Sequence, residues 1–326
     1  MTSINNPILS VHGLTKHFAG GRQEFFGKRD LVQAVDGVNF EVAAGEALAL
    51  VGESGCGKST TGRLITRLLE PTAGTVVFEG QDISHFSNTQ MRPIRTQLQM
   101  IFQDPYASLN PRHTVGTIVS TPFKINKVTP EGGVKKRVQE ILEIVGLNPE
   151  HYNRYPHEFS GGQRQRIGIA RALALRPKLI VADEPVSALD VSIQAQIINL
   201  MKELQKDFGL TFVFIAHDLA VVRHFAQRVA VMYLGNIVEI ADRDTLYATP
   251  KHPYTKALLS AVPEADPDAI GARERIRLTG DIPNPINPPS GCRFRTRCWK
   301  AAEICATQAP ALLQIGATQV ACHFPE

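Results

Sequence analysis

The sequence predicts an α/β fold in which buried strands alternate with helices. Two continuous apolar runs, 47–51 (ALALV) and 179–182 (LIVA), have the pattern of strands buried on both faces of a sheet. A glycine-rich turn and a helix-like segment follow the first run, and further helix–strand alternation follows the second. This alternation favours a largely parallel sheet with helices on both faces.

Each element is predicted from its own local pattern. Apolar and β-branched runs bounded by turn residues predict strands at 8–14, 35–42, 47–51, 76–78, 179–182 and 211–216. Helical patterns predict helices at 58–69, 134–145, 163–175 and 192–208. The strand-like runs 229–233 and 237–240 flank Gly235-Asn236, which predicts a hairpin.

Composition and charge exclude several classes of protein. The chain has 326 residues, 43% of them hydrophobic, and a formal net charge of +4, so we expect roughly two structural units with real cores. No apolar run approaches the roughly 18 residues that cross a bilayer. The first residues lack a basic stretch followed by an apolar one, so we expect no secretory signal. The weak charge gives no argument for nucleic-acid binding.

The most specific motif is a phosphate-binding loop. Residues 52–59 (GESGCGKS) fit the pattern G-x-x-x-x-G-K-S/T, in which backbone N–H groups and a helix N-terminus surround phosphate oxygens. Lys58 is expected to bridge the β- and γ-phosphates, and the Ser59 hydroxyl to ligate Mg²⁺. The predicted nucleotide-binding residues of this loop are Gly52, Glu53, Ser54, Gly55, Cys56, Gly57, Lys58, Ser59 and Thr60.

Two acids at the end of a buried run supply the second half of this predicted site. The run 179–182 leads directly into Asp183 and Glu184. A strand delivers Asp183 to the phosphate edge of the sheet, where its carboxylate can hold Mg²⁺ through water. Glu184 can polarise the attacking water as a general base.

The segment 159–163 (FSGGQ) narrows the prediction to one family. It resembles the LSGGQ signature of ATP-binding-cassette ATPases, with Phe159 in place of leucine. The resemblance implies that Gln103 in IFQDP is the Q-loop glutamine, which contacts Mg²⁺. It likewise implies that 187–190 (SALD) is the D-loop and that His217 is the switch histidine.

In that family two cassettes bind ATP as a head-to-tail dimer. The resemblance therefore implies that the signature contacts ATP held by a partner subunit, through Ser160, Gly161, Gly162, Gln163 and the D-loop Asp190. An aromatic side chain near the N-terminus usually stacks on adenine. Phe18 is the candidate, and Phe25 and Phe26 are alternatives.

Longer runs resemble one branch of the family, the F-type ATP-binding subunit of dipeptide and oligopeptide permeases. They are 103–112 (QDPYASLNPR), 183–192 (DEPVSALDVS) and 252–255 (HPYT), and the likeness extends from 14 to 324. It implies a RecA-like core with an antiparallel β part (1–90 and 157–248), a helical subdomain (91–156) and a small Cys-rich C-terminal extension (249–326).

This branch also implies partners and a cellular place. We expect a homologous ATP-binding subunit, two transmembrane permease subunits and, indirectly, a peptide-binding protein, at the cytoplasmic face of the inner membrane. The cargo predicted is dipeptides or oligopeptides; nickel and oligosaccharides are the alternatives, with a non-transport ABC ATPase less favoured.

Four of the five cysteines lie in the last 35 residues: Cys292, Cys298, Cys305 and Cys322. Without a signal peptide they favour a metal site over disulfides. The spacing lacks paired C-x2-C knuckles, and four thiolates suit either zinc or a four-iron four-sulfur cluster. The resemblance favours the cluster. Nearby basic residues are expected to form a solvated face: Arg293, Arg295, Arg297 and Lys300.

Overall fold

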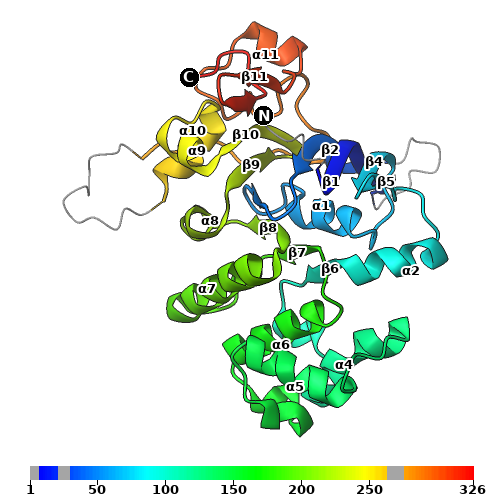
Figure 1. The fold of residues 1–326 in the computed structure, drawn as a ribbon. Coiled ribbons are helices and arrows are strands. Elements are labelled where there is room, and N and C mark those ends of the chain that lie inside the picture. The colour runs from blue at the N-terminus through cyan, green and yellow to red at the C-terminus, as the bar shows by residue number, and fades with distance from the viewer. Residues whose placement is uncertain (1–6, 21–29, 263–274) are drawn as a thin grey trace, which may run out of the picture. The chain divides into compact units, whose positions relative to one another are not determined.

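The computed structural model describes residues 7–20, 30–262 and 275–326. The chain divides into two compact units, and each is described separately. Within the described residues, the first unit contains 43–46 and 85–215, and the second contains 7–42, 47–84 and 216–326. Figure 1 labels most of the helices and strands along the chain.

Parallel strands form the sheet of the first unit. β6 (Leu98–Ile101) pairs with β7 (Leu179–Asp183), and β7 pairs with β8 (Thr211–Ala216). Every residue of β7 and β8 is buried, which confirms that these apolar runs are core strands. The helices of this unit are α2 (Asn88–Gln97), α3 (Pro105–Ser108), α4 (Val115–Asn126), α5 (Val134–Ile144), α6 (Gly161–Leu173) and α7 (Val191–Phe208), with 3₁₀ turns η1 (Pro149–Asn153) and η2 (Pro156–Glu158).

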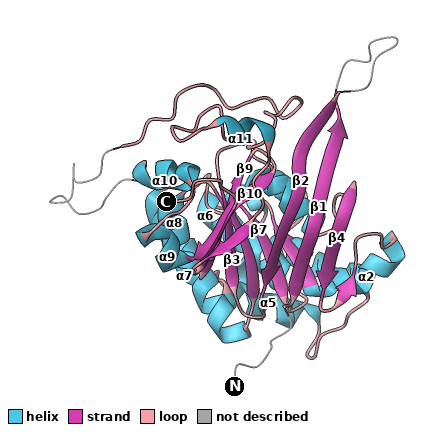
Figure 2. Cartoon of the chain, turned by 90° about the horizontal axis from the view of Figure 1, so that it is seen from above, coloured by secondary structure: helices cyan, strands magenta, loops and turns pink. Residues whose placement is uncertain are grey.

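The second unit holds an antiparallel sheet with the strand order β2-β1-β4-β5. Its strands are β1 (Leu9–Ala19), β2 (Leu31–Val42), β4 (Ala73–Phe78) and β5 (Gln81–Asp82). Figure 2 shows β2, β1 and β4 lying side by side. The first three residues of β1, Leu9, Ser10 and Val11, are all buried, whereas its last two, Phe18 and Ala19, are exposed.

The other strands of the second unit run β11-β12-β10-β9-β3. β3 (Ala47–Val51) is parallel to β9 (Arg228–Tyr233), whereas β10 (Asn236–Asp242), β12 (Thr318–Val320) and β11 (Leu313–Ile315) continue antiparallel. The C-terminal segment is thus hydrogen-bonded to the hairpin that precedes it. The helices here are α1 (Lys58–Ile65), α8 (Leu219–Phe225), α9 (Arg243–Ala248), α10 (Pro253–Ser260) and α11 (Glu303–Thr307).

The predicted elements are present, and β1, β2 and β4 are longer than the predicted runs 8–14, 35–42 and 76–78. Two further differences concern the type of sheet and the length of one helix. The sheet that contains β3 and β9 is mixed rather than largely parallel, because the tight turn between Tyr233 and Asn236 forces β9 and β10 to run antiparallel. The predicted helix 58–69 ends at Ile65, because Arg67 adopts a left-handed backbone with φ of 53° and its side chain bonds the carbonyl of Ile83. Within the described residues, no helix is long and apolar enough to cross a membrane.

Candidate active site

The phosphate-binding loop connects β3 to α1 and depends on glycine at two close approaches. Gly52 and Gly57 have φ of 152° and 106°. A Cβ at Gly52 would lie 2.1 Å from the Met232 carbonyl oxygen, and one at Gly57 would lie 2.1 Å from that of Ala34. Backbone from β9 and β2 therefore fills the space behind the loop, and only glycine fits there.

The start of α1 and the side chain of Lys58 face the loop. Gly57 is the N-cap, so no side chain caps the first-turn N–H groups. Lys58 is 4% exposed, and its Nζ donates to the carbonyl oxygens of Gly52 (2.7 Å) and Glu53 (2.9 Å). An uncapped helix N-terminus, a glycine loop and a fixed ammonium group are the donor set that a polyphosphate requires. The residues present therefore fit the phosphates of ATP.

Glu53 has contacts to the C-terminal segment that the sequence did not reveal. Arg297 forms a bidentate ion pair with its carboxylate, at 2.6 and 3.1 Å. The backbone N–H of Glu53 donates to the Tyr254 hydroxyl at 2.9 Å. These partners lie 244 and 201 residues away along the chain, so no spacing pattern could have indicated them. The only signal was that Tyr254 belongs to the HPYT run.

In the first unit, the structure brings together two residues that were predicted separately. The Gln103 Nε2 donates to Glu184 Oε2 at 2.9 Å. Glu184 has φ of 44°, a left-handed conformation that costs a non-glycine residue about 1 kcal/mol or more. Two hydrogen bonds hold this backbone. The Glu184 N–H donates to the Ile215 carbonyl oxygen (3.0 Å), and the Ser187 hydroxyl donates to the Glu184 carbonyl oxygen (3.1 Å). Asp183, directly before it, is 1% exposed at the end of β7.

The signature segment opens α6, which begins at Gly161, two residues before the predicted helix 163–175. Ser160 is the N-cap and forms a capping box with Gln163, in which each side chain accepts the backbone N–H of the other residue (3.3 and 3.1 Å). Phe159 is 5% exposed and its ring contacts His151 edge-on, so an aromatic side chain is accommodated at the usual leucine position. A Cβ at Gly162 would lie 2.4 Å from Ile193, which explains the glycine by the close packing of α6 against α7.

The remaining predicted residues lie at element boundaries. Asp190 caps α7 by accepting from Ile193 N (3.0 Å) and Ser192 Oγ (2.7 Å), and these hydrogen bonds lower the pKa of its carboxyl. His217 follows β8. Phe18 lies near the end of β1, is 36% exposed and has the Lys16 ammonium 5.3 Å from its ring centroid. The alternatives Phe25 and Phe26 lie outside the described residues.

The predicted site residues are divided between the two compact units. Gln103, the signature, Asp183, Glu184 and Asp190 belong to the first unit. The phosphate-binding loop, Phe18 and His217 belong to the second. The individual roles assigned to these residues stay predictions.

The prediction of an iron–sulfur or zinc site at the terminal cysteines is contradicted. Within the parts of the chain that the structure describes, no group of three or more His, Cys, Asp or Glu side chains could hold a metal ion. Backbone N–H groups of Lys300 and Phe324 instead bond the sulfurs of Cys298 and Cys322, each at 3.4 Å. Burial raises the pKa of the Cys292 thiol to about 11.

Ion pairs and aromatic packing attach this segment in place of a metal. The predicted solvated basic face is wrong for Arg293 and Arg297, whose guanidinium groups are paired with Asp36 and Glu53. Phe294 packs against Tyr233 and Tyr254, with ring centroids 5.2 and 5.3 Å away. The strand β12 of the same segment also pairs with β10. The cysteines are close together in the sequence, but the residues beside them, Arg293, Phe294 and Arg297, make the contacts that attach this segment.

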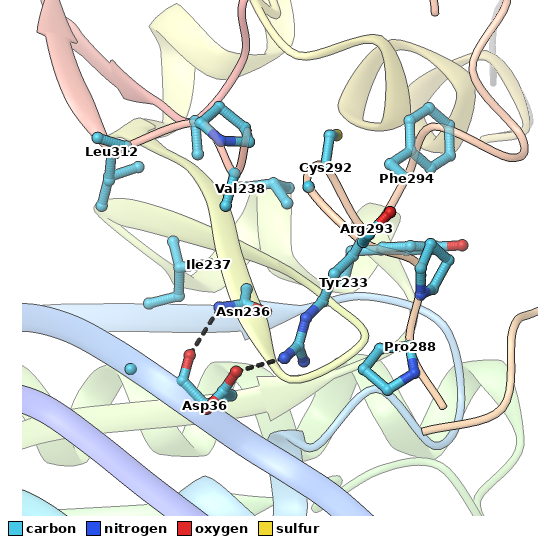
Figure 3. Close-up of a pocket in the computed structure, with 18 of the residues that line it drawn as sticks. Asp36, Tyr233, Asn236, Ile237, Val238, Pro288, Cys292, Arg293, Phe294 and Leu312 are labelled. Carbon is cyan, nitrogen blue, oxygen red and sulfur yellow. Dashed lines mark hydrogen bonds and ion pairs between the residues drawn. The ribbon is translucent and has the colours of Figure 1, made fainter. Parts of the chain in front are cut away.

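A cavity of about 630 Å³ lies beside this attachment, between the C-terminal segment and strands β2 and β10. Figure 3 shows the Arg293 guanidinium directed at Asp36, and Asn236 bonded to the same residue. Cys292 is the only one of the four terminal cysteines among its described lining residues. The charged side chains that line the cavity, Asp36 and Arg293, are thus paired with each other.

Comparison with known proteins agrees with this geometry. Residues 35–187 match the family model "ABC transporter", and residues 238–305 match "Oligopeptide/dipeptide transporter, C-terminal region". The chain is 53% identical to the oligopeptide transport ATP-binding protein AppF of Bacillus subtilis (strain 168), over 99% of both chains. It is 50% identical to the di/tripeptide transport ATP-binding protein DppF of Pseudomonas aeruginosa (strain UCBPP-PA14), over 98% of both.

Solved structures support the cassette fold. The ATP-binding cassette MJ0796, in a dimeric post-hydrolysis state bound to ADP and phosphate, has a TM-score of 0.64 at 29% identity, over 72% of this chain and 98% of that one. CbiO1 of Clostridium perfringens, part of the cbiONQ transporter complex, has the same score and identity, over 74% and 91%. Fold and site thus define an ATPase with a phosphate-binding loop. The chain belongs to the ABC transporter family.

Proposed function

We propose that this chain hydrolyses ATP to power the import of dipeptides or oligopeptides through a membrane permease. The observation that carries the proposal is the 2.9 Å hydrogen bond between Gln103 and the strained Glu184 at the end of a buried strand. Such an arrangement aims a carboxylate where an attacking water must be held. The relatives named for oligopeptide and di/tripeptide transport support the cargo class.

The reaction is attack of water on the γ-phosphate of ATP. Glu184 accepts the proton of that water, and Gln103 orients the carboxylate through its amide. Lys58 and the N–H groups at the start of α1 offset the charge that develops on the phosphoryl oxygens. Mg²⁺, when bound, would be held by Ser59, Asp183 and Gln103 and would neutralise phosphate charge. His217 is proposed to contact the γ-phosphate as the switch residue.

The signature and D-loop are proposed to act on a second ATP-binding subunit. Ser160, Gly161, Gly162, Gln163 and Asp190 would complete the nucleotide site of a homologous partner, and the partner would complete this one. The start of a 13-residue helix supports this role, because its N–H groups favour an anion.

The assembly proposed for this chain contains that partner ATPase and two transmembrane permease subunits, with a peptide-binding protein acting on the other side. The chain itself would be peripheral, at the cytoplasmic face of the inner membrane. Residues 249–326 would form a small C-terminal domain characteristic of peptide importers, which the match over 238–305 supports.

Glu184→Gln provides the test. The amide keeps the size of the side chain but cannot accept a proton, so we expect ATP binding within about threefold of the unsubstituted protein and turnover at least about 100-fold slower. The measurement is uptake of a labelled dipeptide into proteoliposomes containing the complete complex, with ATP binding measured in parallel.

The matched control is Glu203→Gln, an exposed residue of α7 away from every predicted site residue, which should transport normally. Full turnover in Glu184→Gln would contradict the catalytic assignment. Uptake competed by nickel or an oligosaccharide, but not by peptides, would contradict the cargo.

A further inference from the structure

An acidic residue lies inside the loop that must bind a polyanion. Glu53 follows the first glycine of the phosphate-binding loop, and its side chain is 25% exposed. An unpaired carboxylate at this position would repel the triphosphate, because like charges at short range are unfavourable and partial burial weakens solvent screening. The loop therefore requires something that cancels this charge.

Arg297 of the C-terminal segment cancels it directly. Its Nη1 and Nη2 donate to the two carboxylate oxygens of Glu53 at 2.6 and 3.1 Å, which is the fork geometry of the strongest ion pairs. The Arg297 side chain is only 8% exposed, so water screens the pair little. Hydrogen bonding to Glu53 also raises the pKa of Arg297, so its charge is permanent.

The backbone of Glu53 is held from both sides as well. The Tyr254 hydroxyl accepts its N–H at 2.9 Å, and its carbonyl oxygen accepts from Lys58 Nζ at 2.9 Å. Tyr254 is fully buried against Tyr233 and Phe294, so its hydroxyl is fixed in place. Side chain, N–H and carbonyl of Glu53 thus each have a partner, and two of the three come from the segment after residue 250.

We propose that Arg297 is a positioning residue of the nucleotide site: it holds the Glu53 carboxylate and neutralises it, so that the phosphate-binding loop accepts ATP. The C-terminal segment then contributes to the nucleotide site itself, because its Arg297 neutralises the negative charge of Glu53 in the phosphate-binding loop. Any displacement of this segment would expose the Glu53 charge and weaken ATP binding. This inference rests on the proposed function insofar as ATP is the ligand.

The test compares binding of a fluorescent ATP analogue with Mg²⁺ to the full-length chain and its variants. Arg297→Ala should raise Kd about tenfold, because it leaves the Glu53 charge unpaired. The double variant Arg297→Ala/Glu53→Gln should return to within about threefold of the unsubstituted protein, since the charge that needed a partner is gone. Arg297→Lys keeps the charge but not the fork geometry, so its Kd should lie between that of the unsubstituted protein and that of Arg297→Ala.

Arg295→Ala is the matched control. This arginine lies two residues away in the same segment and is half-buried, and its guanidinium bonds only local atoms of Ser290. Its Kd should be unchanged. Thermal unfolding of each variant identifies any loss of fold, and the rescue by Glu53→Gln distinguishes charge neutralisation from mere structural support.

Two results would overturn the inference: an unchanged Kd in folded Arg297→Ala, or a double variant that binds as weakly as Arg297→Ala alone. Either leaves the proposed function intact. Failure of the unsubstituted protein to bind the analogue would instead count against the proposed function itself.

Discussion

Single residues in the phosphate-binding loop are constrained by backbone that approaches from other strands. Gly57 combines φ of 106° with a neighbouring carbonyl oxygen that leaves no room for a Cβ. Gly55, in the same loop, has φ of 78° but open space around it. The two positions therefore separate the cost of a left-handed backbone from the cost of a steric clash.

We expect Gly57→Ala to lower the free energy of unfolding by about 2–3 kcal/mol, because Cβ and the Ala34 carbonyl must move apart. Gly55→Ala should cost about 1 kcal/mol, from backbone strain alone. Chemical denaturation measures both. Equal losses at the two positions would show that the clash relaxes freely.

Among the elements, α10 begins at a buried histidine, His252, whose hydrogen bonds fix the start of the helix. His252 is its N-cap: Nδ1 accepts the Tyr254 N–H at 3.1 Å, and the His252 N–H donates to buried Glu239 at 2.9 Å. Complete burial lowers the pKa of His252 to about 3. Burial raises the pKa of Glu239. The imidazole therefore stays neutral in the folded protein under conditions where the unfolded chain protonates it.

His252 should make this helix sensitive to acid. A His whose folded pKa is lowered binds protons only when unfolded between about pH 6.5 and 3, so stability falls as pH falls through that window. Between about pH 7.5 and 5.5 we expect its contribution to drop by about 1.4 kcal/mol.

The comparison variant is His252→Asn, which keeps a capping acceptor but cannot titrate. Glu239 has the opposite effect: its raised pKa favours protonation of the folded state, so its contribution to stability rises as pH falls. It is present in both the unsubstituted protein and His252→Asn. The difference between their unfolding free energies across this pH range isolates His252. A difference that does not change with pH would contradict the prediction.

At the scale of the whole molecule, two compact units carry different halves of the predicted chemistry. The strained carboxylate proposed as the general base and the signature belong to one unit, and the phosphate-binding loop with its C-terminal attachment belongs to the other. The relatives match over 98–99% of the chain, so the family likeness includes the C-terminal segment as well as the cassette.

Ligand binding should therefore be visible in global stability. At an ATP concentration about 100 times Kd, with Mg²⁺, binding should add about 2.7 kcal/mol and raise the unfolding temperature by several degrees. Lys58→Ala should lose this shift, whereas Lys202→Ala, an exposed lysine of α7, should retain it. Scanning calorimetry with and without Mg²⁺–ATP measures the effect. A full shift in Lys58→Ala would place the nucleotide elsewhere.

Much of the fold and of the candidate site could be predicted because the signals are local. The loop 52–59 is a contiguous motif between an apolar strand and a helix, and the runs 179–183 and 211–216 show their burial in composition alone. Short apolar strands such as β6 and the brief helices α8 to α11 escaped prediction. Their patterns are too short to distinguish helix from strand, and long-range packing determines them.

The sequence by itself determined which chemistry this protein performs, because strand, glycine loop and lysine are adjacent in the chain and their geometry follows from local backbone. Only the tertiary structure decided which partners that chemistry has. It placed Gln103 against Glu184 and paired Arg297 with Glu53. Within the part of the chain that the structure describes, it gave the terminal cysteines no metal-binding group. Such contacts join residues tens to hundreds of positions apart, and they depend on how buried surfaces pack rather than on spacing along the chain.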